Sequence, residues 1–174
     1  MSDTASSPST VTPHWPARAI VTSGQPYGNK DLHFGHISGV FVPADFYARF
    51  LRDRIGARNV AFISATDCYG SPIMEGYRKK VETEGYAGTI EDYVGENHAR
   101  QAQALAAYDI SLDMFAGSAI EPEKHAHDAL TAEIITRLHE RGFLRLRQTK
   151  QFYDPEAKTF LNGRQVRGTC PVEN

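Results

Sequence analysis

The stretch from Ala19 to Gly39 constrains the fold of this chain more than any other. It opens with the β-branched run 19–22, passes through a loop that holds Gly24 and Gly28, and closes where a long apolar helix begins. A strand, a glycine-containing loop and a helix N-terminus in this order hold phosphates in α/β proteins, because free backbone N–H groups point into the loop. The stretch therefore predicts an α/β fold with an anion site at this loop.

Two histidines stand at the expected start of that helix. Because His33 and His36 are three residues apart, a helix places both imidazoles on one face, within reach of an anion. Gly35 lies between them and carries no side chain, so a flat ring such as adenine can press against the backbone. Two alternatives are a pair of hydrogen-bonded structural histidines and a metal pair, for which no third ligand is obvious.

The next segment repeats the pattern of a strand followed by a polar loop. Residues 59–65 predict a second strand, and the loop 66–70 carries Asp67. A strand, a helix and a strand over about 45 residues form a parallel crossover, and ligands bind beyond the carboxyl ends of such strands. Both loops should therefore face one crevice. As an alternative role, Asp67 could cap the helix that starts near Ser71.

The helix between these strands should be well buried. An apolar stripe runs from Ile37 to Ile55, and Phe46 and Tyr47 widen it, so we expect cover on more than one side. The first strand reads as a buried parallel strand. Pro43 could kink the helix, and Gly56 ends it.

The rest of the chain is predicted to be helical and then β. Helices are expected at 72–84, at 90–108 after Thr89 as N-cap, and at 122–141, where Leu130 and Ile134 belong to a core-facing stripe. Alternating segments at 143–146, 151–153 and 159–161, with turns at 154–155 and 162–163, then predict a small β element separate from the first sheet. The expected organisation is a disordered tail over 1–14, a nucleotide-binding portion over 15–142 and an inserted element over 143–174.

Composition excludes several classes of protein. The 174 residues carry a net charge of −2, which gives no support for nucleic-acid binding through bulk charge. No apolar run is long enough to span a membrane, and the first residues lack the apolar core of a secretion signal. Two distant cysteines, Cys68 and Cys170, do not suggest a disulfide framework. We expect a cytoplasmic protein with no membrane contact.

Several motifs in order resemble the methionyl-tRNA synthetase family of class I aminoacyl-tRNA synthetases. They are P-Y-x-N and H-x-G-H, P-A-D-F-Y-A-R-F-L-R (43–52), A-T-D-x-x-G-x-P-I (65–73), Y-D-I-S-x-D (108–113), F-Y-D-P-E (152–156) and V-R-G-T-C-P (166–171). The resemblance implies the first half of a Rossmann-like (HUP-type) parallel nucleotide-binding fold. Helices and the start of a small β connective-peptide insertion with a zinc knuckle would follow.

The resemblance also implies a chemistry, namely activation of an amino acid by ATP with Mg²⁺ to give an aminoacyl-adenylate. His33 and His36 would be the catalytic residues that bind the phosphates and stabilise charge in the transition state. Gly35 and Asn29 would complete the ATP site. The amino acid, methionine or a variant, would be held by three residues: Gln25, Tyr27 and Asp67, the last of which pairs with the α-ammonium group.

The chain departs from the family pattern in ways that bear on specificity and metal content. The family usually has leucine at Gln25 and histidine at Tyr69. Glu173 stands where a Cys-x-x-Cys knuckle needs a second cysteine after Cys170, so zinc is expected only if the chain continues. The late lysine-serine signature of class I synthetases does not occur in the 174 residues. A fragment of the catalytic domain is therefore expected, with tRNA contacts in the missing regions.

Three other functions remain open from the sequence. Gln25 and Tyr69 also fit a synthetase-like adenylating enzyme of natural-product biosynthesis that uses a different amino acid. A truncated paralog that binds nucleotide without catalysis is the non-enzymatic alternative. Small nucleotidyltransferases share H-x-G-H, but the motifs from 108 to 171 favour the synthetase family.

Overall fold

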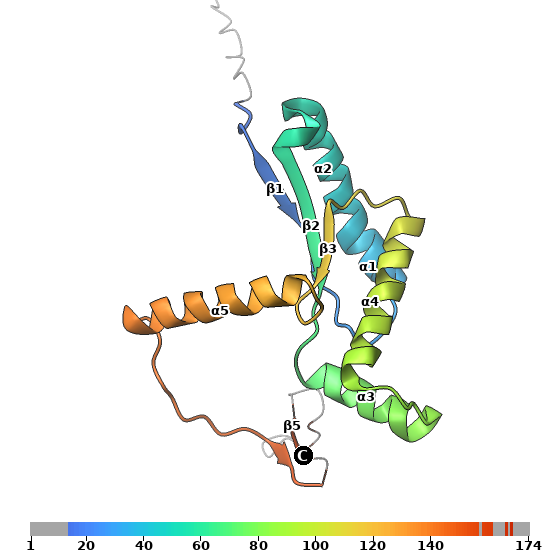
Figure 1. Cartoon of the computed structure of the whole chain (residues 1–174), viewed down its shortest axis with the longest axis vertical. Coiled ribbons are helices and arrows are strands. Elements are labelled where there is room, and N and C mark those ends of the chain that lie inside the picture. Colours follow the sequence, from blue (N-terminus) through green and yellow to red (C-terminus); the bar gives the residue numbers. More distant parts are fainter. Residues whose placement is uncertain (1–13, 157, 162–165, 167, 169–174) are drawn as a thin grey trace, which may run out of the picture.

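A three-stranded parallel sheet forms the centre of the computed structural model, which describes residues 14–156, 158–161, 166 and 168 (Figure 1). The strand order is β1 (Ala19–Thr22), β2 (Val60–Thr66) and β3 (Met114–Gly117). Both β1 and β3 pair with β2 in parallel. The predicted crossover from β1 to β2 is confirmed. β3 was not predicted, because four residues that begin with Met and end with Gly show no alternating pattern.

One long helical run connects β1 to β2. It begins as α1 (Phe34–His36), widens to a π-helical turn over Ile37–Phe41 and continues as α2 (Val42–Ile55). Pro43 lies at the start of α2, directly after the π-helical turn, and the helical run continues through it. Gly56 ends the run with a φ of 90°, a conformation that favours glycine. The predicted helix and its end are confirmed.

The core lies between this helix and one face of the sheet. Val21 of β1 and Phe62 of β2 are neighbours across the sheet, and both pack against Ala48 and Leu51 of α2. Alternate residues of β2 are buried, as expected for a strand with one face against a core. The helix α4 (Ile90–Ala107) covers the same face further along, where Leu105 packs with residues of the π-helical turn.

The opposite face of the sheet is open among the described residues. Ile20 of β1 is 72% exposed, and Met114 of β3 is exposed as well. The outer side of α2 is also open, because Phe46 is 75% exposed and Tyr47 is exposed. The predictions of a fully buried first strand and of a helix covered on more than one side are therefore wrong for the described structure. The described helices that pack on the sheet lie on the face that carries Val21.

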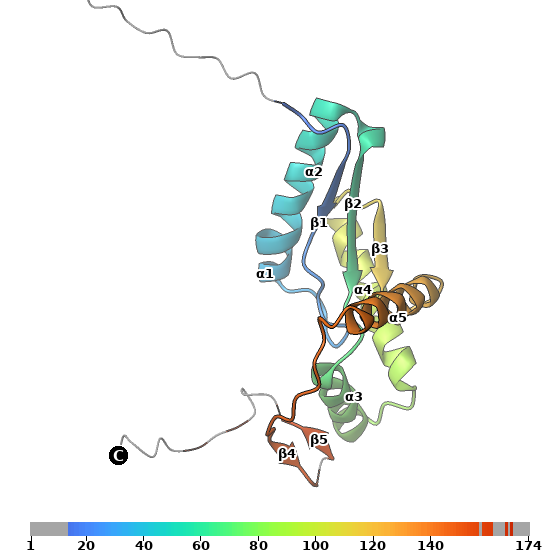
Figure 2. The same ribbon diagram turned by 90° about the vertical axis from the view of Figure 1, so that its left-hand side faces the viewer.

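Three further helices follow β2. The helix α3 (Ser71–Glu84) packs against α4, which Thr89 caps, and α5 (Glu123–Glu140) follows β3. Figures 1 and 2 show α5 extending away from the sheet. The predicted helices are confirmed, but the core-facing stripe on α5 is wrong: no residue of α5 is buried, and Leu130 is 57% exposed. No helix among the described residues is both long and apolar enough to cross a membrane.

A separate two-stranded element follows α5. The strands β4 (Tyr153–Asp154) and β5 (Thr159–Phe160) pair antiparallel and do not join the first sheet, as predicted. Residues 143–146 are not a strand, so that prediction is wrong; an alternating pattern forms a strand only where it finds a pairing partner. The expected turn at 162–163, most of the expected tail at 1–14 and Cys170 lie outside the described residues.

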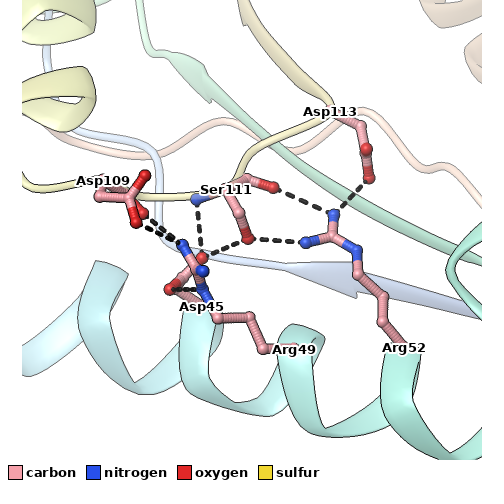
Figure 3. Close-up of polar contacts among 6 residues, drawn as sticks. All are labelled: Asp45, Arg49, Arg52, Asp109, Ser111 and Asp113. Carbon is pink, nitrogen blue, oxygen red and sulfur yellow. Dashed lines mark hydrogen bonds and ion pairs between the residues drawn. The ribbon is translucent and has the colours of Figure 1, made fainter.

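A polar network fastens α2 to the segment that leads into β3 (Figure 3). It joins six residues: Asp45, Arg49, Arg52, Asp109, Ser111 and Asp113. Asp45 accepts the backbone N–H of Ser111 at 2.7 Å, and Arg52 donates to the Ser111 carbonyl at 3.0 Å and to Asp113 at 2.8 Å. Although burial opposes it, the hydrogen bonds from Ser111 and Arg49 keep the pKa of Asp45 below its ordinary value. Two of the family motifs, at 43–52 and 108–113, are thus structural partners of each other.

Candidate functional site

The loops after β1 and β2 meet at the carboxyl edge of the sheet. The N–H of Gly28 donates to the carbonyl of Asp67 at 2.8 Å, and the N–H of Asp67 donates to the carbonyl of Pro26 at 2.8 Å. Tyr27 and Asp67 thereby form an isolated parallel bridge beyond the ends of the two strands. The predicted convergence of the two loops is confirmed, and it places two of the candidate amino-acid-binding residues side by side.

The two candidate catalytic histidines stack on each other at the start of the helix. The rings of His33 and His36 are 3.7 Å apart between centroids with an angle of 20°, so the spacing does bring them together. The Nδ1 atom of His36 accepts the backbone N–H of His33 at 3.2 Å. A neutral His36 therefore carries its proton on Nε2. Burial, with the positive charges of His33 and Lys30, lowers the pKa of His36, which favours this neutral form with one N–H donor to offer an anion.

Gly35 leaves space for the side chain of His33, because it has no side chain of its own. A Cβ atom at this position would lie 3.1 Å from Cε1 of His33, closer than side chains ordinarily approach. Gly35 is exposed, so its backbone also presents a flat surface to solvent. The absence of a side chain therefore serves the His33 ring as well as any ligand that lies against this turn.

Asp67 is half-buried and shapes its own loop. Its Oδ1 atom accepts the N–H of Tyr69 at 3.2 Å. The N-cap of α3 is Gly70, so the alternative role of Asp67 as the cap of this helix is wrong. A carboxylate has about four lone-pair sites. One hydrogen bond therefore leaves it able to accept from a cationic group of a ligand.

The remaining candidate residues divide between exposed and structural positions. Gln25 is exposed and Tyr27 is 44% exposed, so both side chains are accessible to a ligand. Asn29 instead donates from Nδ2 to the carbonyl of Pro72 at 3.0 Å, which ties the loop to the start of α3. Its Oδ1 atom is buried without a hydrogen-bond partner among the described residues. The side chain of Asn29 therefore supports the loop.

Helix α4 supplies residues that were not predicted from the sequence as part of the site. The hydroxyl of Tyr93 donates to the carbonyl of Asn29 at 2.6 Å. The amide of Gln101 donates to the carbonyls of Tyr27 and Lys30, each at 2.9 Å. Two residues of one helix thus hold the backbone of the loop that carries the candidate ligand-binding groups.

A signal for these residues exists in the sequence. Tyr93, Asn97, Gln101 and Leu105 recur every four residues and are all buried on one face of α4. Two amides inside an otherwise apolar stripe must find hydrogen-bond partners, because buried polar groups are costly to leave unpaired. Asn97 meets this need within the helix, at the carbonyl of Tyr93, whereas Gln101 meets it at the loop backbone.

The end of β3 also reaches this edge. Ser118 donates its N–H to the carbonyl of Thr66 at 3.2 Å, and its Oγ atom accepts the N–H of Cys68 at 3.0 Å. Cys68 itself is buried with Ile73. The described residues contain no group of three His, Cys, Asp or Glu side chains that could hold a metal ion, and so they do not supply a zinc site.

The chain is similar to known enzymes over most of its length. Methionine–tRNA ligase of Cytophaga hutchinsonii is 36% identical over 156 residues, which cover 90% of this chain and 21% of that enzyme. The enzyme of the same name from Chlorobaculum tepidum is 34% identical over 159 residues, covering 91% of this chain and 21% of the relative. The chain therefore spans only about a fifth of the length of these curated relatives.

A solved structure and a family match agree with this similarity. Methionyl-tRNA synthetase of Mycobacterium tuberculosis, in complex with methionyl-adenylate, has the same fold with a TM-score of 0.65 at 20% identity, over 86% of this chain and 27% of that one. The expected Rossmann-like parallel fold is thus confirmed. The family described as tRNA synthetases class I (M) matches residues 19–174. A match over nearly the whole chain is decisive, and the chain belongs to this methionine-type family of class I tRNA synthetases.

Proposed function

We propose that this chain provides the ATP and amino-acid site of an enzyme that forms an aminoacyl-adenylate. In this reaction an oxygen of the amino-acid carboxylate attacks the α-phosphorus of ATP. The bond from that phosphorus to the oxygen leading to the β-phosphate breaks, and pyrophosphate leaves. Membership of the family supports the proposal, as do the names of the relatives, which are methionine–tRNA ligases.

The stacked pair His33 and His36 is the observation that carries the proposal. Both imidazoles lie at the start of the helical run 34–55, and His36 has an Nε2–H donor in its neutral form. We assign the pair to the phosphates of ATP, where donors fixed in advance stabilise the charge that develops on the α-phosphoryl group. This is electrostatic positioning, and neither histidine forms a covalent bond to the substrate.

The other groups are assigned by their position along the same edge. Asp67 would accept the α-ammonium group of the amino acid as a charge-assisted hydrogen bond. Tyr27 and the backbone at Gln25 would line the side-chain subsite, because both residues are accessible beside Asp67. The Gly35 turn would lie under adenine, and Asn29 would border the nucleotide. Mg²⁺ enters as part of the MgATP substrate.

Methionine is the amino acid that the relatives' names suggest, but one observation favours a test of others. Gln25 presents an exposed amide on the loop beside Asp67, and an amide can pair with a polar substrate side chain. We propose tRNA as the acceptor of the activated amino acid, with its main contacts outside residues 19–174, because the net charge of this chain is −2.

Amino-acid-dependent exchange of labelled pyrophosphate into ATP tests the proposal. Each of the twenty amino acids is assayed, and calorimetric titration with the non-hydrolysable analogue methionyl-sulfamoyl-adenosine measures binding directly. We expect exchange with methionine, and a loss of about 10²–10³-fold in its rate for His36→Ala. The matched control is His125→Ala, an exposed histidine on α5. The proposal fails if no amino acid supports exchange and the analogue does not bind. ATP binding without either would instead indicate a nucleotide-binding paralog.

A further inference from the structure

One buried amide contacts both the loop after β1 and the last residue of β2, where the second loop begins. Gln101 of α4 is 0% exposed. Its Nε2 atom donates to the carbonyls of Tyr27 and Lys30 in the loop after β1, each at 2.9 Å. Its Oε1 atom accepts the hydroxyl of Thr66, the last residue of β2, at 2.9 Å. Gln101 therefore links the backbone of the loop after β1 to the side chain of Thr66, which directly precedes Asp67.

We propose that Gln101 is a positioning residue that sets the distance between the 27–30 loop and Asp67. This role rests on the proposed function, in which the loop after β1 contacts both the nucleotide and the amino acid, and Asp67 holds the amino acid. A ligand that spans both loops, such as an aminoacyl-adenylate, would be bound in one geometry because the loops cannot shift independently. A ligand that contacts one loop would depend on Gln101 much less.

The hydrogen bonds of Gln101 allow its side-chain amide only one orientation. Both Nε2 protons go to carbonyl oxygens, so turning the amide over would bring Oε1 against two other acceptors. Because Thr66 gives its hydroxyl proton to Gln101, the contact of 2.8 Å between Thr66 Oγ1 and His98 Nδ1 must be donated by His98. A directed chain of hydrogen bonds thus runs from His98 through Thr66 and Gln101 to the loop.

The two loops also contact each other directly. The N–H of Gly28 bonds to the carbonyl of Asp67 at 2.8 Å. A Cβ atom at Gly28 would lie 3.0 Å from Thr66 and 3.1 Å from Val94, so the loop is already in close contact with β2 and α4. Without the Gln101 donors two carbonyl groups would lack partners, and the loop would be expected to move outward to find water.

Matched substitutions on the same helix separate positioning from general stability. Gln101→Met keeps the length of the side chain and removes both donors and the acceptor. Gln103→Met makes the same chemical change at an exposed position two residues further on. Gln101→Asn keeps a neutral amide but is one methylene shorter, so it cannot make all of the Gln101 contacts. This variant replaces Gln101→Met in the test if Gln101→Met does not fold. Thermal unfolding shows which variants are folded at the temperature of the assays.

Ligand affinities distinguish a positioning role from a purely structural one, because a structural role would not change the two affinities differently. Calorimetry compares methionyl-sulfamoyl-adenosine, which spans both loops, with ATP alone. For Gln101→Met we expect the analogue to bind about tenfold more weakly and ATP to change by less than about threefold, with both unchanged in Gln103→Met. Equal losses for the two ligands, or unchanged analogue binding in folded Gln101→Met, would overturn the role.

A ligand-free measurement distinguishes this failure from failure of the proposed function. The amide hydrogens of Gly28 and Asp67 report on the contact between the loops, and their exchange should rise about tenfold in Gln101→Met but not in Gln103→Met. If the unsubstituted protein does not bind the analogue while exchange still rises, the proposed function is wrong and the hold of Gln101 on the two loops stands. Unchanged exchange would refute that hold whatever the ligand data.

Discussion

Helices α4 and α5 have the same length of 18 residues, yet they relate to the rest of the chain in opposite ways. Five residues of α4 are buried, and its inner face holds the loop of the candidate site. No residue of α5 is buried, although Leu130 and Ile134 follow the same spacing of four residues.

The difference teaches that periodicity predicts a helix but not what the helix packs against. Both stripes are typical of an amphipathic helix. On α4 the stripe also contains Asn97 and Gln101, which need polar partners and find them in helix and loop backbone. On α5 the described structure places no element over the stripe. The polar residues within a buried stripe are thus more informative about the site than the apolar ones.

Truncating one leucine on each helix should give the largest contrast. Leu105→Ala removes a side chain that is 2% exposed and packs with Ile37 and Phe41, so we expect a loss of about 2–5 kcal/mol in the free energy of unfolding. Leu130→Ala on α5 should cost less than about 0.5 kcal/mol. Urea denaturation followed by circular dichroism measures both. Equal losses would mean that α5 is packed in solution, and the contrast between the helices would disappear.

Much of the fold could be predicted because it depends on local signals. Thr89 caps α4 through a reciprocal pair with Asp92, and Gly56 ends α2, as their residue types indicate. The three-residue spacing of His33 and His36 likewise predicted that both rings lie on one face, where they stack. β3 escaped prediction because a four-residue strand depends on pairing with β2 rather than on its own pattern.

The unpredicted part of the site depends on contacts that are distant in the sequence. Gln101 bonds to a carbonyl 74 residues away, and Tyr93 to one 64 residues away. No local spacing specifies such a pair. The convergence of the two loops could be predicted, since it follows from parallel strands, whereas the helix that holds them together could not.

Removing one hydroxyl from α4 should loosen the loop with little change in packing. Tyr93→Phe leaves the carbonyl of Asn29 without its donor at 2.6 Å, for which we expect a loss of about 1–3 kcal/mol of stability. Tyr108→Phe, at the exposed C-terminal end of the same helix, is the matched control and should be near neutral. Chemical denaturation gives both values. A neutral Tyr93→Phe would show that water replaces the hydroxyl, and that the other contacts of α4 hold the loop without it.

The N-termini of the two helices offer a smaller contrast. Thr89 accepts the N–H of Asp92 at 3.1 Å, whereas the N-cap of α5 is Pro122 and has no side-chain hydrogen bond. Thr89→Ala should therefore cost about 1 kcal/mol, and Thr89→Ser should restore most of it. Thermal unfolding compares the three proteins. If Thr89→Ala is as stable as the parent, the N-cap contributes nothing to the stability of α4, and the two helices do not differ in this respect.

The smallest effect concerns His98, a half-buried histidine of α4 beside β2. Burial lowers the pKa of His98 below its ordinary value of 6.5, with the charge of Glu123 opposing. The unfolded chain therefore binds more protons than the folded one as the pH falls through this region, so stability is complete above 6.5 and decreases below it. His98→Asn can still donate to Thr66 but does not titrate, and its free energy of unfolding should fall less between pH 7 and pH 5. Some dependence should remain, because the pKa of His36 is lowered in the same direction. If the free energy of unfolding changes equally with pH in parent and variant, His98 is in contact with water. The hydrogen bonds from His98 through Thr66 to Gln101 would then begin at a solvent-exposed group.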